Sequence, residues 1–213
     1  MIADSADTAP VVEERTTIYE GAVFSFVTDK VRLGNEEVVR RDYIDHPGAV
    51  AVVAASDDPD PAILLIRQYR HPVGQRMWEI PAGLTDQAGE DRLEAAKREL
   101  AEETGYAAAT WSHLLDVCTS PGASSERLRI YLAQDLTPTQ APEGFEREGE
   151  EADMEVRFVA LSEIERAIGE GRLHSPSLIM GVLAYARARS TGGPADRDRT
   201  ETQGAFDHNG EKA

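Results

Sequence analysis

The sequence is poor in cysteine. Cys118 is the single cysteine among 213 residues, so the chain cannot form an intrachain disulfide. It stands in an apolar run, and we therefore expect a buried thiol that packs rather than a nucleophile.

Long hydrophobic segments are also lacking. The sequence has no run of about 18 apolar residues, which predicts that no helix crosses a membrane. Its amino terminus lacks the charged and then apolar pattern of a secretory signal. We therefore expect a cytoplasmic protein.

Positive charge is scarce. The 22 Lys and Arg residues face 39 Asp and Glu residues, and the net charge is −17. This balance disfavours non-specific binding to nucleic acid or to an anionic membrane surface. It is compatible with a small substrate that arrives neutralised by a divalent metal. The length suits one domain of ordinary size with tails.

Several familiar catalytic patterns are missing. Ser124 and Ser125 have no evident partner base, and no Gly-rich nucleotide-binding loop follows a strand. The histidines are scattered without the spacing of metal ligands; they are His46, His71, His113, His174 and His208.

The segment 90–104 is the strongest helix signal. It contains no Pro or Gly and is rich in Ala, Leu, Glu, Arg and Lys. Gly105 follows and can take the left-handed conformation that ends a helix. Leu93, Ala96 and Leu100 form its apolar stripe.

Three carboxylates of this helix share one side. Glu99, Glu102 and Glu103 stand at i, i+3 and i+4, within an arc of about 100°. Like charges this close repel unless a cation or an arginine neutralises them. Arg98 can neutralise only part of that charge. A solvated acidic helix face is the alternative interpretation.

The residues around this helix resemble the Nudix box, G-x5-E-x7-R-E-U-x-E-E-x-G-U, in which U is a bulky apolar residue. The matching positions are Glu90, Arg98, Glu99, Leu100, Glu102, Glu103 and Gly105. Six residues rather than five separate Gly83 from Glu90, which indicates an insertion in the preceding loop. Tyr106 stands where an aliphatic residue is usual. The resemblance implies an α/β fold, the Nudix α/β/α sandwich with a mixed β-sheet.

The resemblance also implies a metal-dependent mechanism. The expected cofactor is Mg²⁺, with Mn²⁺ as the alternative, at two or three ions per site. Glu103 and Glu99 are implied as the principal ligands and catalytic residues, with Glu102 and the carbonyl of Ala82 as further ligands. Arg98 would orient these glutamates through charge-assisted hydrogen bonds. Such metals prefer oxygen ligands, and a metal-activated water would attack phosphorus.

Features outside the box resemble the ADP-ribose pyrophosphatase branch. They are Gln68-Tyr69-Arg70, Trp78 to Gly83, Pro121 sixteen residues after Gly105, and Glu150 to Asp153. The branch implies Arg70, Arg40 and Arg41 as substrate-binding residues, and Glu79 and Trp78 are further candidates; for Trp78, packing is the alternative. The expected reaction is Mg²⁺-dependent hydrolysis of ADP-ribose to AMP and ribose 5-phosphate.

The long polar segment 137–153 is the expected source of the general base. The helix glutamates would be occupied with metal, and this segment is the other place where carboxylates cluster. The resemblance implies Glu151. By chemistry alone Glu146, Glu148, Glu150 and Asp153 also qualify.

We divide the chain into four parts: a flexible N-terminus (1–13), an N-terminal antiparallel β subdomain (14–47), the Nudix hydrolase domain (48–189) and a disordered tail (190–213). The predicted strands are 15–20, 23–33, 36–44, 48–54, 62–70, 111–117, 127–133 and 154–160. Helices are predicted from Ser162 to Ile168 and from Pro176 to Arg189, each capped by a serine. Because the hairpin 23–44 has little core of its own, it must pack on the main domain or on a second subunit, and we expect it to pair across a two-fold axis in a homodimer.

Alternatives remain open for the substrate and for catalysis. ADP-glucose, GDP-mannose and NADH are the rival substrates. A rival of another class is a Nudix-like sensor that binds ADP-ribose without hydrolysing it. The intact glutamates of the motif disfavour such a sensor, because a sensor needs no metal ligands.

Overall fold

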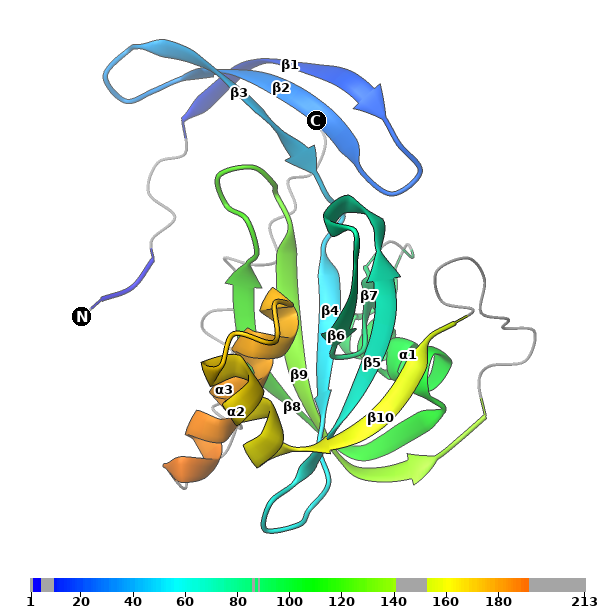
Figure 1. Ribbon diagram of the computed structural model, residues 1–213. Coiled ribbons are helices and arrows are strands. Elements are labelled where there is room, and N and C mark those ends of the chain that lie inside the picture. Colours follow the sequence, from blue (N-terminus) through cyan, green and yellow to red (C-terminus); the bar gives the residue numbers. More distant parts are fainter. Residues whose placement is uncertain (1, 5–9, 86, 88, 141–152, 192–213) are drawn as a thin grey trace. The chain divides into compact units, whose positions relative to one another are not determined.

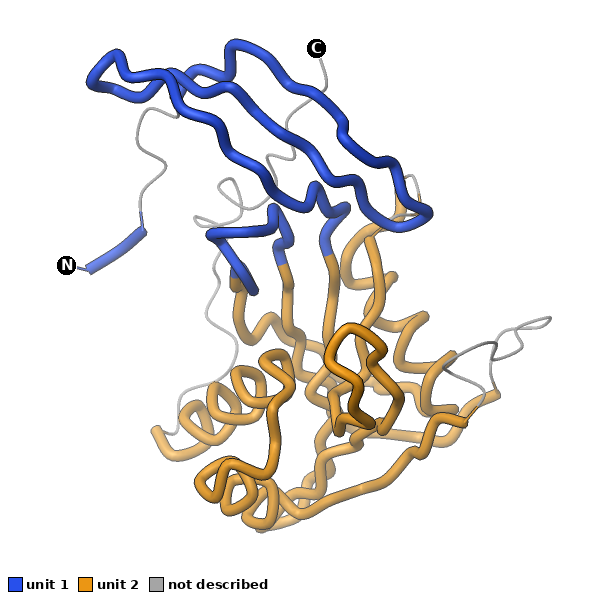
Figure 2. The backbone as a smooth tube through the Cα atoms, turned by 45° about the horizontal axis from the view of Figure 1, so that its top comes forward, with its two compact units in different colours: residues 1–48, 118–127, 198–213 blue, residues 49–117, 128–197 orange. Residues whose placement is uncertain are grey.

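The chain forms two compact units. The computed structural model describes residues 2–4, 10–85, 87, 89–140 and 153–191. Unit 1 comprises Met1–Gly48, Cys118–Arg127 and Asp198–Ala213, and unit 2 comprises Ala49–Val117 and Leu128–Arg197 (Figure 2). Unit 1 thus includes Cys118–Arg127, which the sequence-based division placed within the range 48–189.

Unit 1 is built on an antiparallel sheet of three strands in the order β1-β2-β3. The strands are β1 (Val11–Glu20), β2 (Ser25–Arg32) and β3 (Val38–Asp45). The predicted hairpin is present as β2 and β3, in register from Ser25 opposite Asp45 to Arg32 opposite Val38. β1 starts at Val11 and therefore includes residues 11–13, which were assigned to the flexible N-terminus.

A polar cluster lies at the centre of this sheet. The buried Asp29 accepts two hydrogen bonds from Arg15, at 2.8 and 2.9 Å, and one from the Tyr43 hydroxyl at 2.9 Å. The bonds from Arg15 hold the pKa of Asp29 below its usual value. Burial raises the pKa of Tyr43 to about 12. Among the described strand residues of unit 1, Val27 is the only buried apolar side chain, so this sheet has little hydrophobic core.

Unit 2 contains two further sheets. One has the order β7-β4-β9-β8 and the other β10-β5-β6. β4 and β9 run parallel, whereas β4–β7, β5–β6 and β5–β10 are antiparallel, so the architecture is mixed. The strands are β4 (Ala49–Ala54), β5 (Ala62–Arg70), β6 (Gln75–Glu79), β7 (Ala82–Leu84), β8 (Tyr106–Cys118), β9 (Arg127–Pro138) and β10 (Glu155–Ala160).

Helices cover both sides of unit 2, as Figure 1 shows. Helix α1 (Arg92–Thr104) lies on one side, and α2 (Leu161–Gly169) and α3 (Pro176–Ser190) lie on the other. Alternate residues of β4 join two separate cores. Ala51 and Val53 belong to the core with α2 and α3, whereas Val50 and Val52 belong to the core with α1. The predicted α/β/α sandwich, with a strand buried on both faces, is therefore confirmed. No helix in the described part of the chain is long and apolar enough to span a membrane.

Helix α1 ends where the sequence predicts and begins at Arg92, just after the predicted start at Glu90. The side chain of Asp91 caps its first turn by accepting a hydrogen bond from the Leu93 amide at 2.8 Å. Gly105 has φ of 72° and donates to the Ala101 carbonyl at 2.9 Å, which confirms the left-handed stop. Ala95, Ala96 and Leu100 are buried, so the helix is fixed by its apolar stripe.

Some sequence-based expectations were wrong. The short strands β6 and β7 and the 3-10 turn η1 (His71–Val73) were not predicted. Ser162 does not cap α2; Ala160 holds that position, and Ser162 instead donates to Asp60 at 2.8 Å. Cys118 is exposed, not buried, because it is the last residue of β8, where the apolar run ends.

Strands β8 and β9 carry a partly buried charge cluster. Arg129 donates to both carboxylate oxygens of Asp116, at 2.8 and 3.0 Å, and His113 Nε2 lies 3.1 Å from the same carboxylate. Burial alone would raise the pKa of Asp116, but hydrogen bonds from His113 and Arg129 lower it to about 2. The stability from this cluster is present above the ordinary value of 3.8 and is lost as pH falls towards 2.

Asp116→Asn is expected to lower the free energy of unfolding by about 2 kcal/mol at neutral pH, since the native carboxylate is favoured by nearly two pKa units. The difference in the free energy of unfolding between Asp116→Asn and wild type should shrink as pH falls from about 4 to about 2, because the wild-type carboxylate becomes protonated in this range. Urea unfolding measured across this range checks both points. A difference that stays constant with pH would show that the carboxylate charge is not the source of the effect.

Candidate active site

The carboxylates at helix α1 converge on Arg98. Its guanidinium donates to Glu90 at 3.0 and 3.1 Å, to Glu99 at 2.7 Å and to Glu102 at 3.0 Å. The bonds to Glu90 are the main reason that the pKa of Arg98 lies above its usual value, and the charge of Glu99 adds to the effect. Arg98 therefore stays charged and contacts the carboxylates of Glu90, Glu99 and Glu102 together.

Glu103 occupies a different position, between the helix and β7. Glu103 is only 4% exposed, and one of its carboxylate oxygens accepts a hydrogen bond from the Ala82 amide at 2.9 Å. The next residue, Gly83, approaches Glu99 so closely that a Cβ there would lie 2.0 Å from the carboxyl carbon of Glu99. The backbone at Ala82 and Gly83 thus lies directly against two of the predicted metal ligands.

Gly83→Ala is expected to lower turnover about a hundredfold, because the added methyl must displace the Glu99 carboxylate, and displacements of about 1 Å at a reacting site have effects of this size. Steady-state kinetics and a melting curve together check this. Gly122→Ala is the matched control, since a Cβ at Gly122 meets no atom within 4 Å. Activity of Gly83→Ala equal to that of the control would mean that the position of Glu99 is unimportant.

The donor set suits a hard divalent cation. Glu99, Glu102, Glu103 and the Ala82 carbonyl are all oxygen donors, which Mg²⁺ prefers. Within the described residues, no group of three or more His, Cys, Asp or Glu side chains is already arranged around a metal position. Arg98 pairs with Glu99 at 2.7 Å and with Glu102 at 3.0 Å, and Glu99 also lies against Gly83, the residue that follows Ala82.

Arg70 and Glu79 form an ion pair at the ends of β5 and β6. The Arg70 guanidinium donates to the two oxygens of Glu79 at 3.1 and 2.7 Å. The buried Gln68 donates to the same carboxylate at 3.4 Å. The structure thus brings together two of the predicted substrate-binding residues and adds Gln68, which the sequence marked only as part of a motif.

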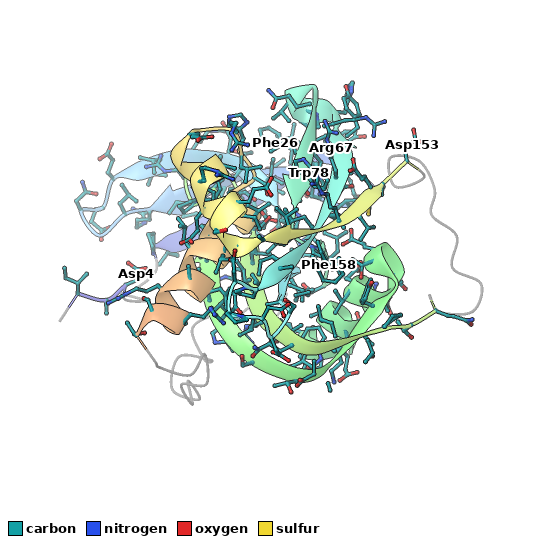
Figure 3. The ribbon with its side chains drawn as sticks, turned by 60° about the horizontal axis from the view of Figure 1, so that its bottom comes forward. Asp4, Phe26, Arg67, Trp78, Asp153 and Phe158 are labelled. Carbon is teal, nitrogen blue, oxygen red and sulfur yellow. The ribbon has the colours of Figure 1, made fainter. Side chains whose placement is uncertain are left out.

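Trp78 is partly buried and packs against the core of unit 2. The Arg67 guanidinium lies over its indole ring at 5.6 Å from the centroid, and Figure 3 shows the two side chains on neighbouring strands.

Asp153, the first residue of the described segment 153–191, pairs with Arg76 of β6 at 3.5 Å. Glu151, Glu150, Glu148 and Glu146 lie outside the described residues.

Arg40 and Arg41 both belong to β3 of unit 1 and are exposed. Because neighbouring residues of a strand point to opposite faces of a sheet, the two arginines lie on different faces. Arg41 shares the face of Asp29 and Arg40 the face of Lys30, their direct cross-strand partners. A ligand on one face can therefore contact only one of the two.

Unit 1 contains a pocket of about 610 Å³, within the usual size range of small-molecule sites. The rings of Phe24 and His46 stack beside it, with centroids 6.3 Å apart. The sequence signalled only Pro121 of this site. Its principal lining residues are Arg15, Phe24, Tyr43, His46, Pro121 and Arg127.

Comparison with known proteins identifies the family. A model of the NUDIX domain matches residues 45–178, which include α1, β7 and the Arg70–Glu79 pair. The chain therefore belongs to the Nudix family and is a hydrolase of the ADP-ribose pyrophosphatase-like type.

Two relatives and one solved structure support this placement. An ADP-ribose pyrophosphatase of Mycobacterium tuberculosis is 42% identical over 168 residues, or 79% of each chain. A methanol dehydrogenase activator of Bacillus methanolicus is 33% identical over 80% of this chain and 91% of its own length. The crystal structure of an ADP compounds hydrolase matches 89% of this chain and 99% of its own with a TM-score of 0.68; at 23% identity this likeness shows the fold alone.

Proposed function

We propose that the chain hydrolyses the diphosphate of ADP-ribose to AMP and ribose 5-phosphate in a Mg²⁺-dependent reaction. The observation that carries the proposal is the packing of Glu99 and Glu103 against Gly83 and Ala82, which gathers oxygen donors beside the half-buried strand β7. The similarity to an ADP-ribose pyrophosphatase over most of both chains supports the substrate.

Each residue has a defined part in this mechanism. Glu99, Glu102, Glu103 and the Ala82 carbonyl would hold Mg²⁺, which when bound neutralises the diphosphate and acidifies a water. Arg98 orients Glu99 and Glu102. Arg70 donates hydrogen bonds to the diphosphate, because its fork of N–H groups matches phosphate oxygens. Glu151 accepts the proton of the attacking water as the new bond to phosphorus forms and the bridging P–O bond breaks.

The N-terminal sheet contributes to substrate binding in this account. The pocket of unit 1 supports that role, because the stacked pair Phe24–His46 offers an aromatic surface to a ring, whereas Arg15 is already paired with Asp29 and Asp45. Arg40 and Arg41 remain candidates, although on opposite faces of the sheet.

A substrate panel tests the proposal. ADP-ribose, ADP-glucose, GDP-mannose, NADH and a nucleoside triphosphate are each incubated with the protein and Mg²⁺, and the released phosphomonoester is measured. We expect the highest kcat/KM with ADP-ribose. Faster hydrolysis of another nucleoside diphosphate derivative would keep the reaction class and change the substrate. Tight binding of ADP-ribose without hydrolysis would instead favour the sensor.

The chain is expected to be a homodimer, with a mass by light scattering at micromolar concentration near twice the 23.3 kDa of one chain. The support is the exposed apolar surface of the N-terminal sheet, which has little core to hold it alone. The exposed side chains include Val11, Val12, Ile18, Tyr19 and Phe26. A fully active monomer at that concentration would contradict this expectation.

A further inference from the structure

The pair Arg70–Glu79 joins a buried group to an exposed one. The side chain of Glu79 is 9% exposed, whereas that of Arg70 is 42% exposed. Two hydrogen bonds, at 3.1 and 2.7 Å, join the Nε and Nη2 edge of the guanidinium to the carboxylate. A bidentate pair of this kind fixes the plane of the guanidinium as well as its position.

Glu79 also accepts a hydrogen bond from a second side chain of β5. The buried Gln68, two residues before Arg70 on β5, donates to Glu79 at 3.4 Å. An ion pair with one solvent-exposed partner contributes little net stability, because water screens its charges. Orientation of the arginine is therefore the better explanation for placing a carboxylate here.

The segment that follows Glu79 leads to the metal ligands. The Pro81 carbonyl accepts a hydrogen bond from the Val52 amide of β4 at 2.8 Å. The Ala82 amide donates to Glu103 of α1 at 2.9 Å. Hydrogen bonds thus fix this segment at Glu79, at Pro81 and at Ala82. Through them the position of Arg70 is set relative to helix α1.

We propose that Glu79 is a positioning residue: it sets the guanidinium of Arg70 at a fixed place relative to Glu103, and it does not itself contact the substrate. The inference rests on the proposed function, in which Arg70 binds the diphosphate. Arg70 contacts the substrate both before and during the reaction, so its misplacement weakens binding throughout. The effect of changing Glu79 should therefore fall on KM more than on kcat.

A double-mutant cycle tests the proposal. Glu79→Gln, Arg70→Ala and the double variant are compared in hydrolysis of ADP-ribose with Mg²⁺. We expect Glu79→Gln to raise KM about tenfold, since a charge-assisted contact is weakened. In the Arg70→Ala background the same change should alter KM less than about twofold, because the residue it positions is gone. Equal effects in both backgrounds would overturn the proposal and assign Glu79 a contact of its own.

Two further variants separate positioning from stability. Glu155→Gln is the matched control, since Glu155 pairs with Arg67 on the same sheet at 3.7 Å, and it should leave KM unchanged. Gln68→Met removes the hydrogen bond that Gln68 donates to Glu79 and puts an apolar side chain of similar size in its place. Like Glu79→Gln, the Gln68→Met variant should raise KM. It therefore tests the proposal even if Glu79→Gln does not fold. An unchanged KM in a folded Gln68→Met or Glu79→Gln protein would contradict the proposal.

Failure of the proposed function is distinguishable from failure of this inference. If wild type prefers another nucleoside diphosphate derivative, the cycle is run with that compound, because the diphosphate that Arg70 would bind is common to the panel. An additive cycle with an active wild type rejects the positioning role alone. A wild type without activity towards any member of the panel rejects both.

Discussion

Glu103→Gln is expected to lower turnover by several orders of magnitude while the protein stays folded. Glu103 lies at the contact between α1 and β7, where its carboxylate accepts the Ala82 amide. Glutamine keeps the shape and can still accept that hydrogen bond through its amide oxygen. It removes one negative charge from the proposed metal site, so metal affinity and activation of water should both fall.

The comparison requires a control on the same helix. Glu94→Gln serves, because the Glu94 side chain is 61% exposed and pairs with Lys97 on the solvent side. It should match wild type in both turnover and melting temperature. Glu99→Gln should behave like Glu103→Gln. If Glu103→Gln retains activity within about tenfold of wild type at saturating Mg²⁺, the carboxylates of α1 are not the metal ligands.

Glu151→Gln is expected to lower kcat about a hundredfold or more, which is the usual range for loss of a general base. KM should change much less, because proton transfer occurs in the transition state. Stopped assays at saturating ADP-ribose and Mg²⁺ measure the first quantity, and a substrate titration measures the second.

Glu146→Gln is the matched control from the same acidic segment and should be nearly silent. A different pattern would reassign the base. If Glu150→Gln or Glu148→Gln loses activity while Glu151→Gln keeps it, the base is that other glutamate. If none of the three matters, Glu102 on α1 is the next candidate.

The sequence predicts the helix that carries the carboxylates because its signals are local. The run of helix-forming residues and Gly105 specify the body and the end of α1 without help from the rest of the fold, whereas the helix starts at Arg92 and not at the predicted Glu90. The continuous apolar run of β4 likewise predicts a strand covered on both faces, and the two cores that meet there confirm it.

Other features depend on contacts between distant residues and leave no local signal. The amide and the hydroxyl of Ser162 both donate to Asp60, about a hundred residues earlier in the chain, so the local sequence alone wrongly indicated Ser162 as the cap of α2. The bond between Ala82 and Glu103 and the close approach of Gly83 to Glu99 arise only when β7 packs on α1. The Arg70–Glu79 pair likewise has no local signal, because the register of β5 and β6 places Arg70 opposite Gln75 and the two side chains of the pair meet along one face of the sheet.

The central claim is that the carboxylates of α1 support metal-dependent cleavage within a diphosphate. Product analysis of ADP-ribose, incubated with the wild-type protein in Mg²⁺ and in excess chelator, tests it most directly. The account predicts AMP and ribose 5-phosphate in equal amounts with Mg²⁺, and neither product with chelator. ADP with free ribose as products, or equal turnover in chelator, would contradict it.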